Sequence, residues 1–426
     1  MSIAELYKIF LQYPSVQTDT RKLKAGDIFF ALKGPNFNGN GFAAKALEAG
    51  AEYAVVDEAD AVINERTILV ADVLQALQDL AKHHREQFNI PFIAITGSNG
   101  KTTSKELVYA VLSSNYITYT TQGNLNNHIG VPLTLLGVKK NAEMAVVEMG
   151  ANHQKEIESY CSYTQPTHGI ITNAGKAHLE GFGGVEGVKK GKGELYDFLR
   201  AHDGTAFVYD DYDYLREMAV GVPHIVKYGT SNGSVQGHVL ASEPYLHIAI
   251  TAGMKMVNEI RSQLVGDYNL PNILCAVAVG KYFNVPEEKI KQAIEHYVPS
   301  NSRSQLLQQG SNSIILDAYN ANPTSMKAAI ENFARLKAPR KVLMLGGMME
   351  LGPESLKEHA NIISLIKQYP WNQVVLVGGD FANTPHNFIF FPNSTEAKAW
   401  FDAQHFNDTH VLVKGSRSMQ MEKILG

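Results

Sequence analysis

A glycine-rich stretch at positions 96–103 holds the residues most able to do chemistry. It follows the apolar run 92–95 and precedes a helical pattern at 104–112. After a strand, such glycines let successive backbone N–H groups point at phosphate oxygens, and the helix start adds a partial positive charge. Lys101 is placed to reach the β- and γ-phosphates, and the Thr102 hydroxyl is placed to bind magnesium. The residues of this predicted nucleoside triphosphate site are Thr96, Gly97, Ser98, Asn99, Gly100, Lys101, Thr102 and Thr103.

The phosphate-loop pattern is incomplete at one position, because Ile95 stands where the pattern has its first glycine. The alternative is a glycine-rich loop whose lysine is only solvated. That alternative explains neither the strand before the loop nor the run Gly-Lys-Thr-Thr before a helix, so the phosphate site is the preferred interpretation.

Three polar residues further along the chain stand out, and one of them, Glu148, is a candidate metal ligand. Glu148 ends an apolar strand, and a carboxylate at the carboxyl end of a parallel strand points into the crevice where ligands bind. Magnesium prefers hard oxygen ligands, so Glu148 is a reasonable second anchor beside Thr102. His178 follows the next strand, and Lys192 lies in a basic run. Taken alone, each of these features is more typical of a solvated surface than of a site.

The composition excludes several classes of protein. The chain has 426 residues, of which 45% are hydrophobic and 19% charged, as is typical of a globular protein with several cores. Its formal net charge of -4 provides no positive field for nucleic acid. Its two cysteines, Cys161 and Cys275, do not make a disulfide framework. The start of the chain has no signal-peptide pattern and no apolar run is long enough to cross a membrane, so we expect a soluble, cytoplasmic protein without membrane insertion.

The order of strand-like and helical segments predicts an α/β protein with three domains. Short strands and a helix capped by Asp72 make up residues 1–89. Alternating strands and helices over 90–300 predict a mostly parallel sheet around the phosphate loop. The same alternation over 301–426 predicts a doubly wound, Rossmann-like sheet. The strands expected are 28–32, 53–56, 67–70, 92–95, 145–148, 169–172, 314–316, 342–345, 374–377 and 411–413.

Taken in order, the motifs resemble one family, the Mur ligases of bacterial cell-wall synthesis. Each stretch is short, but together they span nearly the whole chain, which makes coincidence a poor explanation. The stretches that carry the resemblance are 18–21, 26–32, 96–103, 123–132, 148–150, 178–183, 192–194, 317–323, 350–352 and 414–417.

The resemblance implies a three-domain Mur ligase-like architecture and a division of labour among the domains. The first domain would hold the UDP end of a precursor, the central domain ATP and magnesium, and the last domain would close over both. The resemblance is closest to the members that use ATP to join D-alanyl-D-alanine to UDP-N-acetylmuramoyl-tripeptide through an acyl phosphate. We therefore expect a monomeric ligase of peptidoglycan precursor synthesis that uses ATP and Mg²⁺.

The same resemblance implies roles for individual residues. The residues expected to be catalytic are Lys101, His178, Lys192 and Arg303. Those expected at the metal are Thr102, Glu148, His178 and Lys192, the last as a carbamate. Those expected around the nucleotide, besides the phosphate loop, are Asn269, Asn272, Arg303, Asp317 and Asn320. Those expected near the precursor or the dipeptide are Thr20, Arg21, Asn126, Asn127, Asn322, Lys414 and Ser416.

The chain departs from the family pattern in three places. Tyr268 stands where members often have histidine, 38–40 lacks the usual Asp-Gly-His, and 346–348 lacks the usual aspartate. Two alternatives stay open. One is a sister ligase, either one that adds the third residue of the peptide or one that adds glutamate to a folate. Against the first of these, the Asp-Asn-Pro-Arg stretch of diaminopimelate-adding relatives is absent from this sequence. The other is a nucleotide-binding module that ligates nothing. Whether the third peptide residue is diaminopimelate or lysine also stays open.

Overall fold

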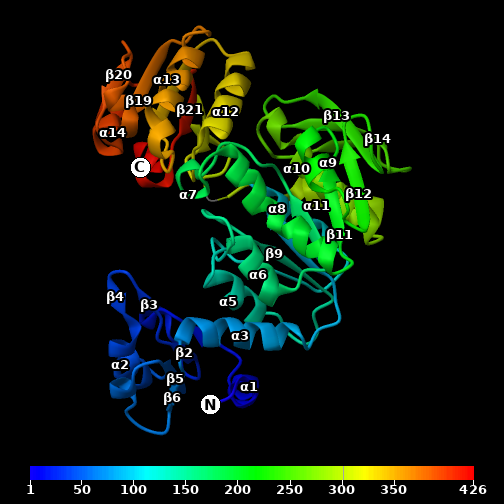
Figure 1. Ribbon diagram of the computed structural model, residues 1–426. Coiled ribbons are helices and arrows are strands. Elements are labelled where there is room, and N and C mark those ends of the chain that lie inside the picture. The colour runs from blue at the N-terminus through cyan, green and yellow to red at the C-terminus, as the bar shows by residue number, and fades with distance from the viewer. Residues whose placement is uncertain (301) are drawn as a thin grey trace.

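The computed structural model describes residues 1–300 and 302–426, and three main sheets follow one another along the chain (Figure 1). The first sheet has four parallel strands in the order β1-β2-β5-β6, and β3 and β4 form a separate antiparallel pair. Its strands are β1 (Val16–Gln17), β2 (Ile28–Phe30), β3 (Lys33–Gly34), β4 (Phe37–Asn38), β5 (Tyr53–Val56) and β6 (Thr67–Leu69).

Helix α3 (Val73–Arg85) joins the first sheet to the central one. It begins after Asp72, whose side chain accepts a hydrogen bond from the Gln75 N–H, as the sequence predicts. Near the end of α3, one ring nitrogen of His84 bonds to the Tyr7 hydroxyl of α1. The other ring nitrogen bonds to the backbone carbonyl of Val138, next to the central sheet's helix α5. Figure 1 shows α3 lying between the first sheet and helices α5 and α6. The other helices here are α1 (Ile3–Gln12) and α2 (Ala43–Glu48).

The central sheet has nine strands in the order β15-β14-β13-β12-β11-β10-β7-β9-β8. All neighbours from β13 to β8 are parallel, which confirms the predicted parallel sheet. Its parallel strands are β7 (Phe92–Thr96), β8 (Thr118–Thr120), β9 (Met144–Glu148), β10 (His168–Ile171), β11 (Thr205–Tyr209), β12 (His224–Gly229) and β13 (Val235–Ala241).

The far edge of the central sheet is antiparallel and was not expected from the sequence. Strands β14 (His247–Ala252) and β15 (Glu259–Arg261) continue the sheet beyond β13. Buried and partly exposed side chains alternate along most of β14, as is typical of an antiparallel edge with one face toward water. The central helices are α4 (Lys101–Ser113), α5 (Gly130–Leu136), α6 (Glu156–Thr164), α7 (Leu179–Phe182), α8 (Val185–Ala201), α9 (Asp213–Met218), α10 (Leu270–Tyr282) and α11 (Glu287–His296).

The third sheet has the order β16-β17-β21-β18-β19-β20, with only the β16–β17 pair antiparallel. The switch of strand order around β17, β21 and β18 is that of a doubly wound sheet. Its strands are β16 (Gln305–Gln309), β17 (Asn312–Asp317), β18 (Lys341–Gly346), β19 (Gln373–Val377), β20 (Ile389–Phe391) and β21 (His410–Lys414). Its helices are α12 (Pro323–Arg335), α13 (Ser355–Ile366) and α14 (Ser394–Ala403).

The α/β class and the doubly wound third sheet agree with the sequence-based predictions. Every strand expected from the sequence is present, with ends shifted by no more than two residues. The domain limits at 89/90 and 300/301 stay predictions, and residue 301 itself lies outside the described residues. Among the described residues, no helix is both long and apolar enough to cross a membrane.

Candidate active site

The stretch 96–103 forms the turn between β7 and α4. Gly97 and Gly100 adopt φ angles of 143° and 78°, a region that favours glycine. A Cβ atom at Gly97 would lie 2.0 Å from the Thr172 side-chain oxygen, so the loop has no room for one. Within the described part of the chain, no side chain caps α4 at Gly100, and its first N–H groups are free to bind an anion.

The backbone of the loop is fixed from the end of β10. Asn173 uses both atoms of its amide on Asn99, accepting from the backbone N–H at 2.9 Å and donating to the carbonyl at 3.0 Å. Thr172 donates a second hydrogen bond to the same carbonyl at 2.6 Å. Ser98 exchanges hydrogen bonds with the backbone of Gly175 at 3.0 Å. The loop is therefore held in shape by protein contacts alone, as a preorganised anion site requires.

Lys101 is half-buried at the start of α4. Its ammonium donates to the backbone carbonyls of Gly97 at 2.7 Å and Ser98 at 3.3 Å. Burial lowers the pKa of Lys101 to about 8; Glu148 opposes that shift and the positive charge of Arg303 adds to it. A triphosphate would supply the negative partner that this desolvated ammonium lacks.

Glu148 lies at the end of β9 and is 1% exposed. One carboxylate oxygen accepts hydrogen bonds from the Thr102 hydroxyl at 3.0 Å and from the Asn126 amide at 2.8 Å. The other oxygen is buried and has no hydrogen-bond partner among the described residues. A buried carboxylate oxygen without a partner is costly, and a divalent cation would satisfy it. Glu148 and Thr102 therefore fit a magnesium ion shared with nucleotide phosphates.

His178 lies at the edge of the same cavity, at the start of α7, with a φ of 52°. Its Nδ1 atom contacts the carboxylate of Glu350 in the C-terminal part of the chain. The contact with His178 lowers the pKa of Glu350. Within residues 1–300 and 302–426, no three His, Cys, Asp or Glu side chains gather closely enough to hold a metal ion alone. The ring of His178 thus connects α7 to the third sheet's domain.

Lys192 is buried inside α8 and does not belong to a solvated basic face. Its amine donates to the backbone carbonyl of Ala151 at 2.9 Å and lies 4.9 Å from the centre of the Phe182 ring. Gly191 makes this packing possible, since a Cβ atom there would lie 2.4 Å from the ring. Burial holds the pKa of Lys192 well below its usual value, and the charge of Lys101 lowers it further against two nearby glutamates. The lowered pKa of Lys192 favours the neutral amine.

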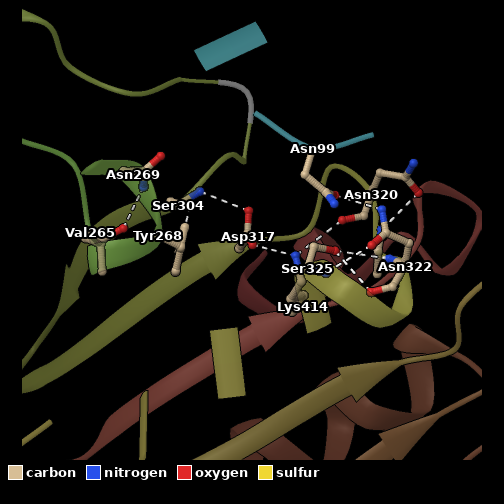
Figure 2. Close-up of polar contacts among 11 residues, drawn as sticks. Asn99, Val265, Tyr268, Asn269, Ser304, Asp317, Asn320, Asn322, Ser325 and Lys414 are labelled. Carbon is tan, nitrogen blue, oxygen red and sulfur yellow. Dashed lines mark hydrogen bonds and ion pairs between the residues drawn. The ribbon is translucent and has the colours of Figure 1, made fainter. Parts of the chain in front are cut away.

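Two asparagines at the start of α10 border the phosphate loop. Asn269 donates to the backbone carbonyl of Val265 at 2.8 Å (Figure 2), and its oxygen accepts from Asn272 at 2.8 Å. The Asn272 oxygen accepts from the Ser104 hydroxyl of α4 at 2.9 Å. A Cβ atom at Gly100 would lie 2.7 Å from the same oxygen. Hydrogen bonds fix both amides beside the loop, and their role at the adenosine, which the family resemblance implies, stays a prediction.

A chain of polar contacts crosses the cavity to the third sheet (Figure 2). The Tyr268 hydroxyl lies 3.0 Å from the Ser304 hydroxyl, and the Ser304 N–H donates to Asp317 at 3.1 Å. The other Asp317 oxygen pairs with the Lys414 ammonium at 2.5 Å, and Lys414 also reaches the carbonyl of Asn320 at 3.4 Å. Tyr268, one of the three departures from the family pattern, therefore has a polar partner in Ser304.

Arg303 stacks on an aromatic ring at the cavity wall. Its guanidinium carbon lies 3.6 Å from the centre of the Tyr319 ring. Its Nε atom is buried and has no hydrogen-bond partner in the part of the chain that the structure describes. Stacking fixes the plane of the guanidinium while leaving its donors for an anionic ligand.

One cavity of about 800 Å³ collects most of the predicted site residues. The predicted residues that line it are Ser98, Asn99, Gly100, Lys101, Thr102, Thr103, Asn126, Asn127, Glu148, His178, Asn269, Asn272, Arg303, Asp317, Asn320, Asn322 and Lys414. The predicted residues outside its lining are Thr96, Gly97, Lys192, Ser416, Thr20 and Arg21.

The residues outside the lining differ in their surroundings. Lys192 lies behind Ala151, which lines the cavity. Ser416 is buried and donates to the carbonyl of Gly347 at 2.7 Å. Thr20 and Arg21 lie in the first domain, where the Arg21 side chain is exposed and pairs with Asp19.

Comparison with known proteins assigns the family. Three family descriptions match: "Mur ligase family, catalytic domain" at residues 12–85, "Mur ligase middle domain" at 95–280 and "Mur ligase, glutamate ligase domain" at 302–417. The UDP-N-acetylmuramoyl-tripeptide–D-alanyl-D-alanine ligase of Bacillus subtilis is 34% identical, over 100% of this chain and 96% of that protein. The chain belongs to the Mur ligase family. This Mur ligase is also 32% identical to the Escherichia coli ligase of the same name, over 99% and 95% of the two chains.

Solved structures resemble this Mur ligase over nearly its whole length. A crystal structure of MurF from Acinetobacter baumannii has a TM-score of 0.87 and 32% identity, and covers 96% of this chain and 92% of that one. The Thermotoga maritima MurF ligase, solved with ADP, has a TM-score of 0.87 and 24% identity, and covers 97% of both chains. The three-domain Mur ligase architecture expected from the sequence is thereby confirmed.

Sequence reasoning missed several residues that shape the site of this Mur ligase. Asn173, whose amide clamps the phosphate loop, was not singled out, because one asparagine after a strand carries no pattern of its own. Thr121 accepts a hydrogen bond from the Glu148 N–H at 3.0 Å and was likewise missed. Glu350 was noted only within the motif 350–352, and its contact with His178 depends on the third sheet's position. Contacts between distant segments leave no local signal.

Proposed function

We propose that this Mur ligase uses ATP to join D-alanyl-D-alanine to UDP-N-acetylmuramoyl-tripeptide in peptidoglycan precursor synthesis. The observation that carries the proposal is one cavity in which the phosphate loop and the buried carboxylate of Glu148 face Arg303, Asp317 and Lys414. The named activity of the Bacillus subtilis and Escherichia coli relatives supports the choice of substrates. Action in the cytoplasm as a monomer stays a prediction.

Forming an amide from a carboxylate requires an activated acyl group. An oxygen of the tripeptide's terminal carboxylate attacks the γ-phosphorus of ATP, and ADP leaves. The amine of the dipeptide then attacks the acyl carbon, phosphate leaves with the carboxylate oxygen, and the amine loses a proton. The first step brings two anions together, so Lys101 and Arg303 supply positive charge that is in place before reaction. Closure by the C-terminal domain excludes water that would hydrolyse the acyl phosphate.

Thr102 and Glu148 are the residues that would hold a magnesium ion. The free oxygen of Glu148 and the hydroxyl of Thr102 are the hard ligands that this ion prefers, and the nucleotide and water would complete its coordination. When bound, the ion neutralises the charge that develops on the phosphates. His178 lines the same cavity and extends the site toward the C-terminal domain.

Lys192 would act as a carbamate. Carbon dioxide adds to a neutral amine to give an N-carboxylate and one proton, and the low pKa of the buried Lys192 favours the neutral form. The carboxylate would bring oxygen ligands to the side of the site behind Ala151. A free lysine offers three donors and no acceptor, so it has no such use beside a cation.

The substrates would occupy opposite sides of the nucleotide. Thr20 and Arg21 lie in the first domain, where the UDP end of the precursor would bind. Asn126 and Asn127 line the same cavity as the phosphate loop, where the peptide part of the precursor would extend from the first domain toward ATP. Lys414 reaches the cavity from the end of β21, where the dipeptide would enter, and the nearby Ser416 donates a hydrogen bond to the carbonyl of Gly347.

The highest kcat/KM is expected for the pair UDP-N-acetylmuramoyl-tripeptide and D-alanyl-D-alanine. Phosphate release should be measured with a panel of UDP-muramoyl peptides, single amino acids, D-amino-acid dipeptides and a folate with glutamate. The expected preference over each sister pair is at least about a hundredfold, since a site built to bond a substrate rejects one that leaves its polar groups unpaired. A UDP-muramoyl-dipeptide with a single amino acid giving the higher kcat/KM would favour the sister-ligase alternative.

A further inference from the structure

One side chain of the phosphate loop bonds directly to the C-terminal domain. The Asn99 side-chain oxygen accepts a hydrogen bond from the Asn322 amide at 2.7 Å (Figure 2). Asn322 lies at the start of α12, which follows the third sheet's first parallel strand. The loop that would cradle the phosphates therefore also touches the domain that closes over them.

The capping of α12 fixes the orientation of both amides. The Asn322 side-chain oxygen accepts from the Ser325 N–H at 2.9 Å, so this atom must be the oxygen and the other must be the nitrogen. Because the Asn322 nitrogen is a donor, the Asn99 atom that it meets must be the oxygen. The Asn99 nitrogen then points the other way, and its two hydrogens need acceptors elsewhere.

The Asn99 nitrogen is a buried donor at the cavity wall. It has no hydrogen-bond partner within the described residues, although Asn99 lines the cavity. The residue has little freedom to move, because Thr172 and Asn173 hold its backbone on both sides. A buried donor left unpaired is costly, so a fixed one at a ligand cavity indicates an acceptor on the ligand.

We propose that the Asn99 side chain couples nucleotide binding to domain closure. Its nitrogen donates to a phosphate oxygen of the bound nucleotide while its oxygen holds Asn322 of the C-terminal domain. The ionised oxygens of a nucleotide phosphate accept hydrogen bonds, which matches the donors of this loop: the N–H groups at the start of α4 and the ammonium of Lys101. The proposal rests on the proposed function, since it assumes that the cavity binds ATP. Asn99 is a positioning residue that makes phosphate binding and closure support each other.

Variants of Asn99 and Asn322 test this coupling through ADP affinity, measured by calorimetry. Asn99→Ala should weaken ADP binding about tenfold, as expected for one hydrogen bond to a charged group. Asn322→Ser keeps a capping oxygen for α12 but removes the donor to Asn99. Asn322→Ser should therefore weaken ADP binding in the wild-type background and have no further effect in the Asn99→Ala background. The unfolding temperatures of the free variants should stay close to that of the wild type.

A second contact between the domains provides the matched control. Lys176 of the central domain pairs with the buried Glu358 of α13 at 2.5 Å, without touching Asn99. Glu358→Gln weakens this contact, and its effect on ADP affinity should multiply with that of Asn99→Ala. X-ray scattering should show that ADP compacts the wild type more than Asn99→Ala.

The outcomes separate this inference from the proposed function. If the wild type binds no adenine nucleotide, the proposed function fails. If the wild type binds ADP and Asn99→Ala binds it equally well, the function stands and the coupling is wrong. Effects of Asn99→Ala and Asn322→Ser that multiply would also overturn the coupling, because they would show that the two side chains act independently.

Discussion

Lys101→Ala is expected to leave the protein folded and to lower its turnover number by at least about a thousandfold. The Lys101 ammonium is half-buried at the start of α4, where the backbone carbonyls of Gly97 and Ser98 accept its hydrogen bonds. In the transition state, negative charge spreads over the transferred phosphoryl group, and a desolvated cation there is worth more than in water. The loss should appear mainly in kcat, measured as ADP release with saturating substrates.

An exposed lysine provides the control for the loss of one positive charge. Lys140→Ala removes a charge from the surface and should leave turnover within about twofold, as is usual for surface substitutions. Circular dichroism and thermal unfolding should show the same fold for both variants. A folded Lys101→Ala protein with near-normal ligation would falsify the assignment of the phosphate loop.

Lys192→Ala is expected to be nearly inactive, with turnover lowered by at least about a hundredfold. Among the described residues the buried amine bonds only to the carbonyl of Ala151, and it packs against Phe182, which is a poor place for a free ammonium. As a carbamate, the same side chain would provide oxygens for a cation. The alanine variant leaves space where that carboxylate stood, so formate or acetate should restore part of the activity.

Two further substitutions separate the carbamate from simple packing. Lys192→Met keeps the aliphatic volume without an amine, so it should be inactive and should not respond to formate or acetate. Lys190→Ala removes an exposed lysine of the same basic run and should remain active. A crystal of the magnesium–nucleotide complex should show extra density on the Lys192 nitrogen. An active Lys192→Ala variant, together with an unmodified Lys192 in that crystal, would rule the carbamate out.

Local patterns in the sequence were sufficient to predict the phosphate loop and the sheet around it. The loop at 96–103 combines glycines that need special backbone angles with a strand before and a helix after, and all of these features are close in sequence. Glu148 was predictable because a polar residue that ends an apolar strand lies at the ligand-binding edge of a parallel sheet. The resemblance to a family added Arg303 and Asp317, which lie far from the loop in sequence.

Contacts that depend on tertiary structure could not be predicted. Lys192 belongs to a basic run of a kind that is usually solvated, and only the packing of α8 against Phe182 buries it. The bond between Asn99 and Asn322 joins residues of two domains, and neither has a local pattern that indicates the other. The antiparallel strands β14 and β15 were missed because half-exposed edge strands lack a continuous apolar run.

The transfer of a heavy-oxygen label tests the central claim most directly. The tripeptide precursor is prepared with the label in both oxygens of its terminal carboxylate, and the phosphate released during ligation to D-alanyl-D-alanine is analysed by mass spectrometry. An acyl phosphate route predicts one labelled oxygen in each phosphate, with the other retained in the new amide carbonyl. Phosphate that carries no label while the amide forms would contradict that route, and labelled phosphate without the UDP-muramoyl-pentapeptide product would contradict ligation.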